Sequence, residues 1–181
     1  MKITRKWLEK KGAGSDGLHW FLNQSEVDLY QLIDQLMKEE RKNWAVWLLI
    51  EAMNGQQQLQ FAIACAEMVL PIFEGKYPQD NRPRLAIAAA KKVLVNNSKE
   101  NRKAAFAAAC AAAAAFETVE MEAAACAAAA AHGAAKAHGA AKKAAFAASA
   151  TEAASWATKK AAFAANWEQT IQTGINILKG K

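Results

Sequence analysis

The chain has 181 residues, a length that suits one compact domain with a small appended region. Hydrophobic residues make up 53% of it, and its formal charge of +6 includes no dense run of lysine or arginine. Such a pattern does not favour nucleic-acid binding, which needs concentrated positive charge. The amino-terminal segment lacks the apolar centre of a signal peptide, and no apolar run is hydrophobic enough to cross a membrane. We therefore expect a cytoplasmic protein.

Residues 1–55 are predicted to form an N-terminal extension of short amphipathic helices. Thr4 is placed to cap a first helix, because its hydroxyl can accept a hydrogen bond from a free backbone amide. Gly12 and Gly14 are expected to end this helix. A brief turn is expected around residues 18–22.

Two longer helix signals complete this extension. Ser25, with Asp28 three residues later, resembles a capping box at the start of a helix. Apolar side chains from Val27 onward recur with a helical rather than an alternating period. Another apolar segment covers residues 44–53 and is expected to end at the Asn-Gly pair that follows.

Residues 56–181 are predicted to form an alanine-rich helical bundle, packed as one unit. Pro71 should kink its first helix or end the first part of it, because proline lacks the backbone N–H. A turn over residues 77–81 should precede a helix that begins at Arg82-Pro83-Arg84, since proline favours the first helical turn. Ser98 is expected to cap the next helix.

A block of extreme composition, residues 104–165, decides the fold class. Alanine supplies 35 of its 62 residues, and alanine is the strongest helix former. A basic pair one turn ahead of an aromatic residue occurs three times, at Phe106, Phe146 and Phe163. We interpret each copy as a solvated face beside a core anchor. No segment shows strand alternation, so the sequence predicts an all-α fold, a compact bundle of short amphipathic and alanine-rich helices.

Groups able to carry chemistry are scarce in this sequence. Cys65, Cys110 and Cys126 are expected to be reduced and buried, and no Cys/His cluster has the spacing of a zinc site. We therefore expect no metal, no cofactor and no catalytic residue. His132 and His138 stand six residues apart, which places their rings about 120° apart on a helix. They are either histidines at the edge of the core or residues that face two different grooves.

The segment from Asp80 to Arg84 is the strongest candidate for a binding site. Arg82 and Arg84, beside a helix start with free amides, could clamp a carboxylate or a phosphate. Equally, these arginines could pair with Glu67, Glu74 and Asp80 and so lock the corner between two helices. The sequence leaves both interpretations open.

Several short motifs around this segment carry a family resemblance. They are Cys65-Ala66-Glu67, Leu70-Pro71-Ile72-Phe73-Glu74, Tyr77-Pro78 and Asp80-Asn81-Arg82-Pro83-Arg84. The chain resembles the alanine-rich putative immunity protein family, the immunity-protein-five-like group of bacteria and phage-related genomes. The resemblance covers roughly residues 45–165, and the His132…His138 pair is similar to paired histidines of the family.

This resemblance implies a genomic association with polymorphic toxins. It does not imply any one mechanism, because no mechanism is common to the group. Met68 and Lys142 stand where relatives often carry histidine, which weakens a metal or catalytic role. The N-terminal extension lies outside the match and is similar to extensions of phage and prophage versions.

Two functions from different classes follow. The first is a non-enzymatic immunity or counter-defence factor that occludes a protein partner, either a toxin or a defence protein. Tryptophans of the extension could anchor such an interface, although core positions are favoured for two of them, Trp44 and Trp47. The alternative is a helical pocket for a small anionic ligand such as a nucleotide. That pocket would use Glu67, Asp80, Arg82, Arg84, His132 and His138.

Overall fold

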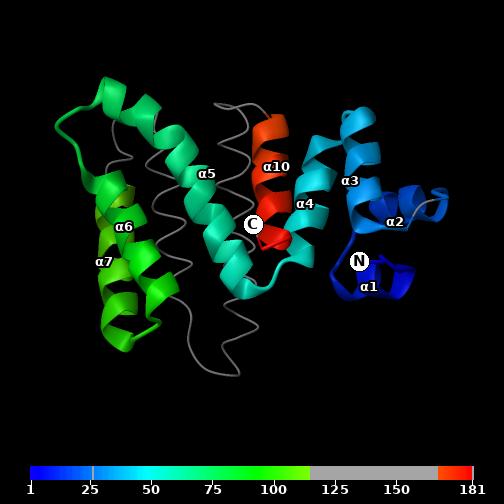
Figure 1. Ribbon diagram of the computed structural model, residues 1–181, viewed down its shortest axis with the longest axis horizontal. Helices are drawn as coiled ribbons and strands as arrows, with labels where there is room; N and C mark the ends of the chain where they lie inside the picture. The colour runs from blue at the N-terminus through cyan, green and yellow to red at the C-terminus, as the bar shows by residue number, and fades with distance from the viewer. Residues whose placement is uncertain (26, 115–166, 181) are drawn as a thin grey trace. The chain divides into compact units, whose positions relative to one another are not determined.

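The structure, a computed structural model, describes residues 1–25, 27–114 and 167–180 (Figure 1). These residues form helices and one isolated β-bridge, so the predicted all-α fold is confirmed. The chain divides into two compact units, Met1–Ala52 and Met53–Lys181. None of the described helices is both long and apolar enough to span a bilayer. The helices are α1 (Arg5–Lys10), α2 (Ser15–Leu22), α3 (Leu29–Lys38), α4 (Lys42–Ala52), α5 (Gly55–Lys76), α6 (Arg82–Val95), α7 (Lys99–Ala114) and α10 (Trp167–Leu178).

The first unit begins as its sequence predicts and then departs from the prediction. The Thr4 hydroxyl accepts a hydrogen bond from the Trp7 amide at 3.2 Å and caps α1. Gly12 follows α1 with a positive φ of 78°, a conformation that costs glycine little. Gly14 does not end α1; it is the N-cap residue of α2. The turn expected at residues 18–22 is wrong, because this segment is the second half of α2.

The start of α3 is set by a pairing that helix periodicity does not reveal. The Ile3 amide donates to the Val27 carbonyl at 2.7 Å, and the Leu29 amide donates to the Met1 carbonyl at 2.8 Å. These bonds keep the backbone extended as far as Asp28, whose side chain accepts from the Tyr30 amide at 3.0 Å. The predicted cap at Ser25 is therefore wrong, and Asp28 caps α3 instead.

Aliphatic side chains and Phe21 fill the core of the first unit. The α3 and α4 helices pack against each other, and α1 packs against α2. The four tryptophans of this unit are half-buried and lie outside this fully buried set. The buried residues are Ile3, Leu8, Phe21, Leu29, Leu32, Ile33, Leu36, Ala45, Val46, Leu48, Leu49 and Ile50.

A strained residue joins α3 to α4. Glu40 has a φ of 57°, in the left-handed region that favours glycine. The Arg41 amide donates to the Leu36 carbonyl at 2.8 Å, and the Glu40 amide donates to the Met37 carbonyl at 3.1 Å. Together these bonds form a Schellman motif, which satisfies carbonyls at the end of α3.

In the second unit, α5 begins at a capping box. The Asn54 side chain accepts from the Gln57 amide at 2.9 Å, and the Gln57 side chain accepts from the Asn54 amide at 3.0 Å. The Gln57 side chain also donates to the Ile177 carbonyl at the end of α10, at 3.2 Å. Pro71 does not end the helix, which continues to Lys76. Because Pro71 is exposed, water can satisfy the carbonyl that proline leaves without a donor.

The α5, α6 and α7 helices follow one another in space, with α5 against α6 and α6 against α7. Small buried side chains, including Ala66, Ala86 and Ala90, allow α5 and α6 to approach closely. Ser98 caps α7 as predicted, by accepting from the Asn101 amide at 3.1 Å. Phe106 is 50% exposed, so the interpretation as a core anchor is wrong for this copy. Phe146 and Phe163 lie outside the described residues.

Replacing Glu40 with glycine tests the strain between α3 and α4. We expect Glu40→Gly to raise the free energy of unfolding by about 1 kcal/mol, because glycine adopts the left-handed conformation without a steric penalty. Denaturant unfolding of the full chain, followed by tryptophan fluorescence, measures the change. Glu40→Ala is the matched control, since it removes the same side chain but keeps the strain. Equal stabilisation by both variants would contradict this account.

Candidate functional site

The candidate site lies where α5 turns into α6. We name it the α5–α6 corner and define it by the charged side chains Glu67, Glu74, Asp80, Arg82, Arg84 and Lys91. Its geometry follows from a spacing of seven residues. Seven residues advance a helix by about 10.5 Å and almost two full turns, so their side chains share one face. Glu67 and Glu74 have this spacing on α5, and Arg84 and Lys91 have it on α6. The two helices thus present an acidic pair and a basic pair to each other at matching intervals.

Two ion pairs connect these helices. The Arg84 Nε donates to Glu74 Oε1 at 2.7 Å, and its Nη2 donates to Glu74 Oε2 at 2.6 Å. This two-point geometry fixes both direction and distance. Two turns away, Lys91 Nζ donates to Glu67 Oε1 at 2.6 Å. The Arg84 side chain is 63% exposed and the Glu74 side chain 27%, so the pairs lie at the surface.

A third ion pair shapes the turn itself. Asp80 Oδ1 accepts from the Arg82 amide at 3.1 Å and from Arg82 Nε at 2.9 Å. Arg82 Nη2 donates to Asp80 Oδ2 at 2.6 Å. One carboxylate therefore holds both the first amide of α6 and a guanidinium group. Pro83, which is buried, fixes the backbone of the first helical turn beside them.

These contacts set the protonation of the corner. Hydrogen bonds from the Arg82 side chain lower the pKa of Asp80 below its ordinary value of 3.8, against an opposing effect of burial. The same bonds raise the pKa of Arg82, and the bonds to Glu74 raise the pKa of Arg84. Three carboxylates face three cations in this corner, so these six side chains form a fixed pattern of paired charges that sums to zero.

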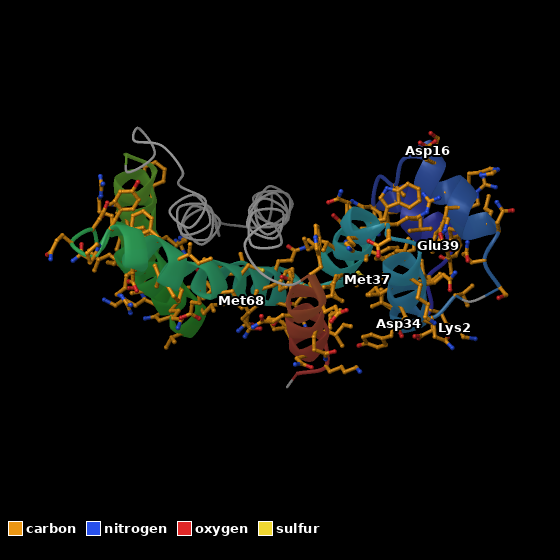
Figure 2. The ribbon with its side chains drawn as sticks, turned by 90° about the horizontal axis from the view of Figure 1, so that it is seen from above. Lys2, Asp16, Asp34, Met37, Glu39 and Met68 are labelled. Carbon is orange, nitrogen blue, oxygen red and sulfur yellow. The ribbon has the colours of Figure 1, made fainter. Side chains whose placement is uncertain are left out.

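The structure shows the partners of all five charged residues that the sequence predicted for this site, but it does not describe the two histidines. Asp80 pairs with Arg82, Glu74 pairs with Arg84, and Glu67 pairs with Lys91. His132 and His138 lie outside the described residues, so their proximity to the corner stays a prediction. Met68 is a half-buried residue of α5 (Figure 2).

Two features escaped the sequence analysis. Lys91 was missed as the partner of Glu67, although the matched spacings of seven on α5 and α6 are visible in the sequence. The contacts between Trp20 of α2 and Trp44 of α4 were also missed. Their ring centroids lie 6.3 Å apart, with an interplanar angle of 74°. No local pattern connects residues on separate helices, so this contact had no signal in the sequence.

Comparison with known proteins adds the family. Residues 48–176 match the model of the family described as Imm-5 like putative immunity protein. The chain belongs to this family. The Imm-5 like match begins inside α4 and includes the whole α5–α6 corner, whereas residues 1–47 lie outside it. Neither the curated proteins nor the solved structures gave a significant match to the chain.

The acid titration of Asp80 tests the contact with Arg82. Because the folded-state pKa lies below 3.8, the stabilisation by Asp80 is complete above that pH and is lost as the pH falls through the lower, folded value. We expect an NMR titration of the Asp80 carboxyl carbon to show a midpoint below 3.8. In Arg82→Gln the midpoint should rise towards 3.8. An unchanged midpoint in that variant would show that another group lowers the pKa.

A charge swap tests the Glu74–Arg84 pair. We expect Glu74→Arg and Arg84→Glu each to lower the melting temperature slightly, because each places like charges together and exposed pairs contribute little. The double swap should recover most of the loss, since it restores an ion pair in the reverse direction. Thermal unfolding followed by circular dichroism measures all three variants. Additive losses in the double variant would show that the pair does not couple α5 to α6.

Proposed function

We propose that this chain is an immunity or counter-defence factor that binds a protein partner, a toxin or a defence protein, and blocks it by occlusion. The observation that carries the proposal is the family match over residues 48–176. The proposal assigns no catalytic residue and no cofactor. Occlusion needs a surface of fixed shape and charge, and it needs no reactive group.

The α5–α6 corner suits such a surface. Its arginines are already oriented by carboxylates, so little side-chain freedom remains to be lost when a partner binds. Acidic side chains on α5 beside basic side chains on α6 provide specificity, because a partner with a mismatched charge pattern meets like charges. The binding residues proposed here are Glu67, Asp80, Arg82 and Arg84, with His132 and His138 as further candidates outside the described residues.

The alternative, a pocket for a small anionic ligand such as a nucleotide, fits this corner less well. An incoming phosphate would have to displace Asp80 from Arg82 or Glu74 from Arg84. Both carboxylates are held by two or more charge-assisted hydrogen bonds. The exposed remainder of each guanidinium is better suited to a second contact with a protein surface than to enclosing a ligand.

Native mass spectrometry tests the proposal and its alternative together. The tagged full chain is purified from the lysate of its own host, and the wild type is compared with the Glu74→Arg/Arg84→Glu double swap. We expect a retained protein of defined mass on the wild type and its loss from the double swap, which should keep an ion pair in the reverse direction and therefore the fold. The purified partner should then lose its own activity when it is mixed with the wild-type chain.

Other results would contradict occlusion. A retained small molecule, lost in Arg82→Ala/Arg84→Ala, would favour the anion pocket. A retained protein whose activity is unchanged by the chain would remove the immunity function. Bare protein in every sample would leave the corner with a structural role alone.

A further inference from the structure

The four tryptophans of the first unit are only half-buried. Its core is filled by aliphatic residues and Phe21, while Trp7, Trp20, Trp44 and Trp47 are all half-buried. Burying tryptophan in a core would contribute far more area than burying valine or alanine. Because the tryptophans are only half-buried, part of the apolar area of their rings remains accessible to another molecule.

Two of these tryptophans belong to a closed ring of contacts. The Trp20 indole N–H donates to Glu39 Oε2 at 2.6 Å, and Arg41 Nε donates to the same oxygen at 3.1 Å. The Arg41 guanidinium lies 4.5 Å from the centroid of the Trp44 ring, and Trp44 meets Trp20 edge to face. Glu39 is the C-cap residue of α3 and is labelled in Figure 2. We name these four residues the Trp20–Trp44 surface.

This surface is fixed before any partner arrives. Gln35 Nε2 donates to the second oxygen of Glu39 at 2.8 Å, so the carboxylate is held from both sides. Hydrogen bonds from Gln35, Trp20 and Arg41 lower the pKa of Glu39 below its ordinary value. The left-handed Glu40 turns the chain between Glu39 and Arg41.

The orientation of Arg41 indicates what a partner has to offer. Its Nε is occupied by Glu39, and one face of its guanidinium covers Trp44, yet its side chain remains 43% exposed. A guanidinium that is stacked on an aromatic ring and held at Nε directs its remaining N–H groups outward, where they match a carboxylate. Tryptophan and arginine are also the residues that most often dominate protein interfaces.

We propose that the Trp20–Trp44 surface binds a protein that presents a carboxylate to Arg41 and a neighbouring apolar side chain to the tryptophan rings. The inference rests on the proposed function in taking the occupant to be a protein. It goes further by locating a contact outside the family match, in residues 1–47. The residues that match the family model would then be supplemented by a contact, specific to this chain, that selects its partner.

A random peptide library selected on the full chain tests this proposal without knowledge of the natural partner. We expect enriched peptides to carry aspartate or glutamate next to an apolar residue. Their affinity should fall about tenfold or more in Arg41→Lys, which keeps the charge but loses the planar group. Trp44→Leu should cause a similar loss. Lys92→Ala, an exposed change on α6, is the matched control and should bind as the wild type does.

Melting curves of the variants show whether each has folded. Arg41→Lys keeps the charge and most of the side chain, so a loss of peptide affinity in this folded variant cannot be due to unfolding. Peptides without an acidic residue, peptides insensitive to Arg41 and Trp44, or no enrichment would each overturn the proposal. Tight binding of a labelled single-stranded oligonucleotide that is lost in Arg41→Lys would identify a nucleic-acid surface instead and would also overturn it. If peptides bind as expected but no toxin or defence protein is blocked, the surface stands and the immunity function fails. The reverse result keeps the function and removes this surface.

Discussion

The burial of α5 is the constraint on which the second unit depends. This helix packs against α6 and against α10. Its fully buried residues include Phe61, Cys65 and Ala66. A helix covered on several sides cannot rotate or slide without exposing large apolar area, at a cost of roughly 25 cal/mol for each Å² returned to water. The capping box at Asn54 fixes where the helix begins, and burial fixes which face points outward.

The pattern of charge on the corner follows from that constraint. Once the apolar faces of α5 and α6 have met, Glu74 lies opposite Arg84 and Glu67 lies opposite Lys91. Exposed pairs of this kind add little stability, but each removes alternative pairings and so specifies one register of the two helices. In the proposed function, the same arrangement would give a partner protein a rigid pattern of charges to recognise.

Local signals in the sequence predicted much of this fold. Alanine composition gave the class, Thr4 and Ser98 gave two helix starts, and Pro83 gave the start of α6. Contacts between distant residues could not be predicted in the same way. The pairing of Ile3 with Val27 moved the cap of α3 to Asp28, against a plausible local motif at Ser25.

The candidate site was predictable to a similar extent. Its carboxylates and arginines were recognised from their types and their position at a helix start. Their pairing partners depended on how α5 and α6 pack, which a single sequence leaves open. The Trp20–Trp44 contact depended on the packing of α2 against the α3–α4 turn. Neither the half-burial of the tryptophans nor the left-handed Glu40 has a local sequence signature.

We propose that this member of the Imm-5 like family acts by occupying a surface of its partner and changes no covalent bond. The most direct measurement titrates the activity of the purified partner with the full chain and then weighs the partner by mass spectrometry. Occlusion predicts inhibition that saturates at a fixed molar ratio, reverses when the chain is removed and leaves the mass of the partner unchanged. Inhibition at far lower ratios, with a permanent change in that mass, would contradict the account and indicate an enzyme.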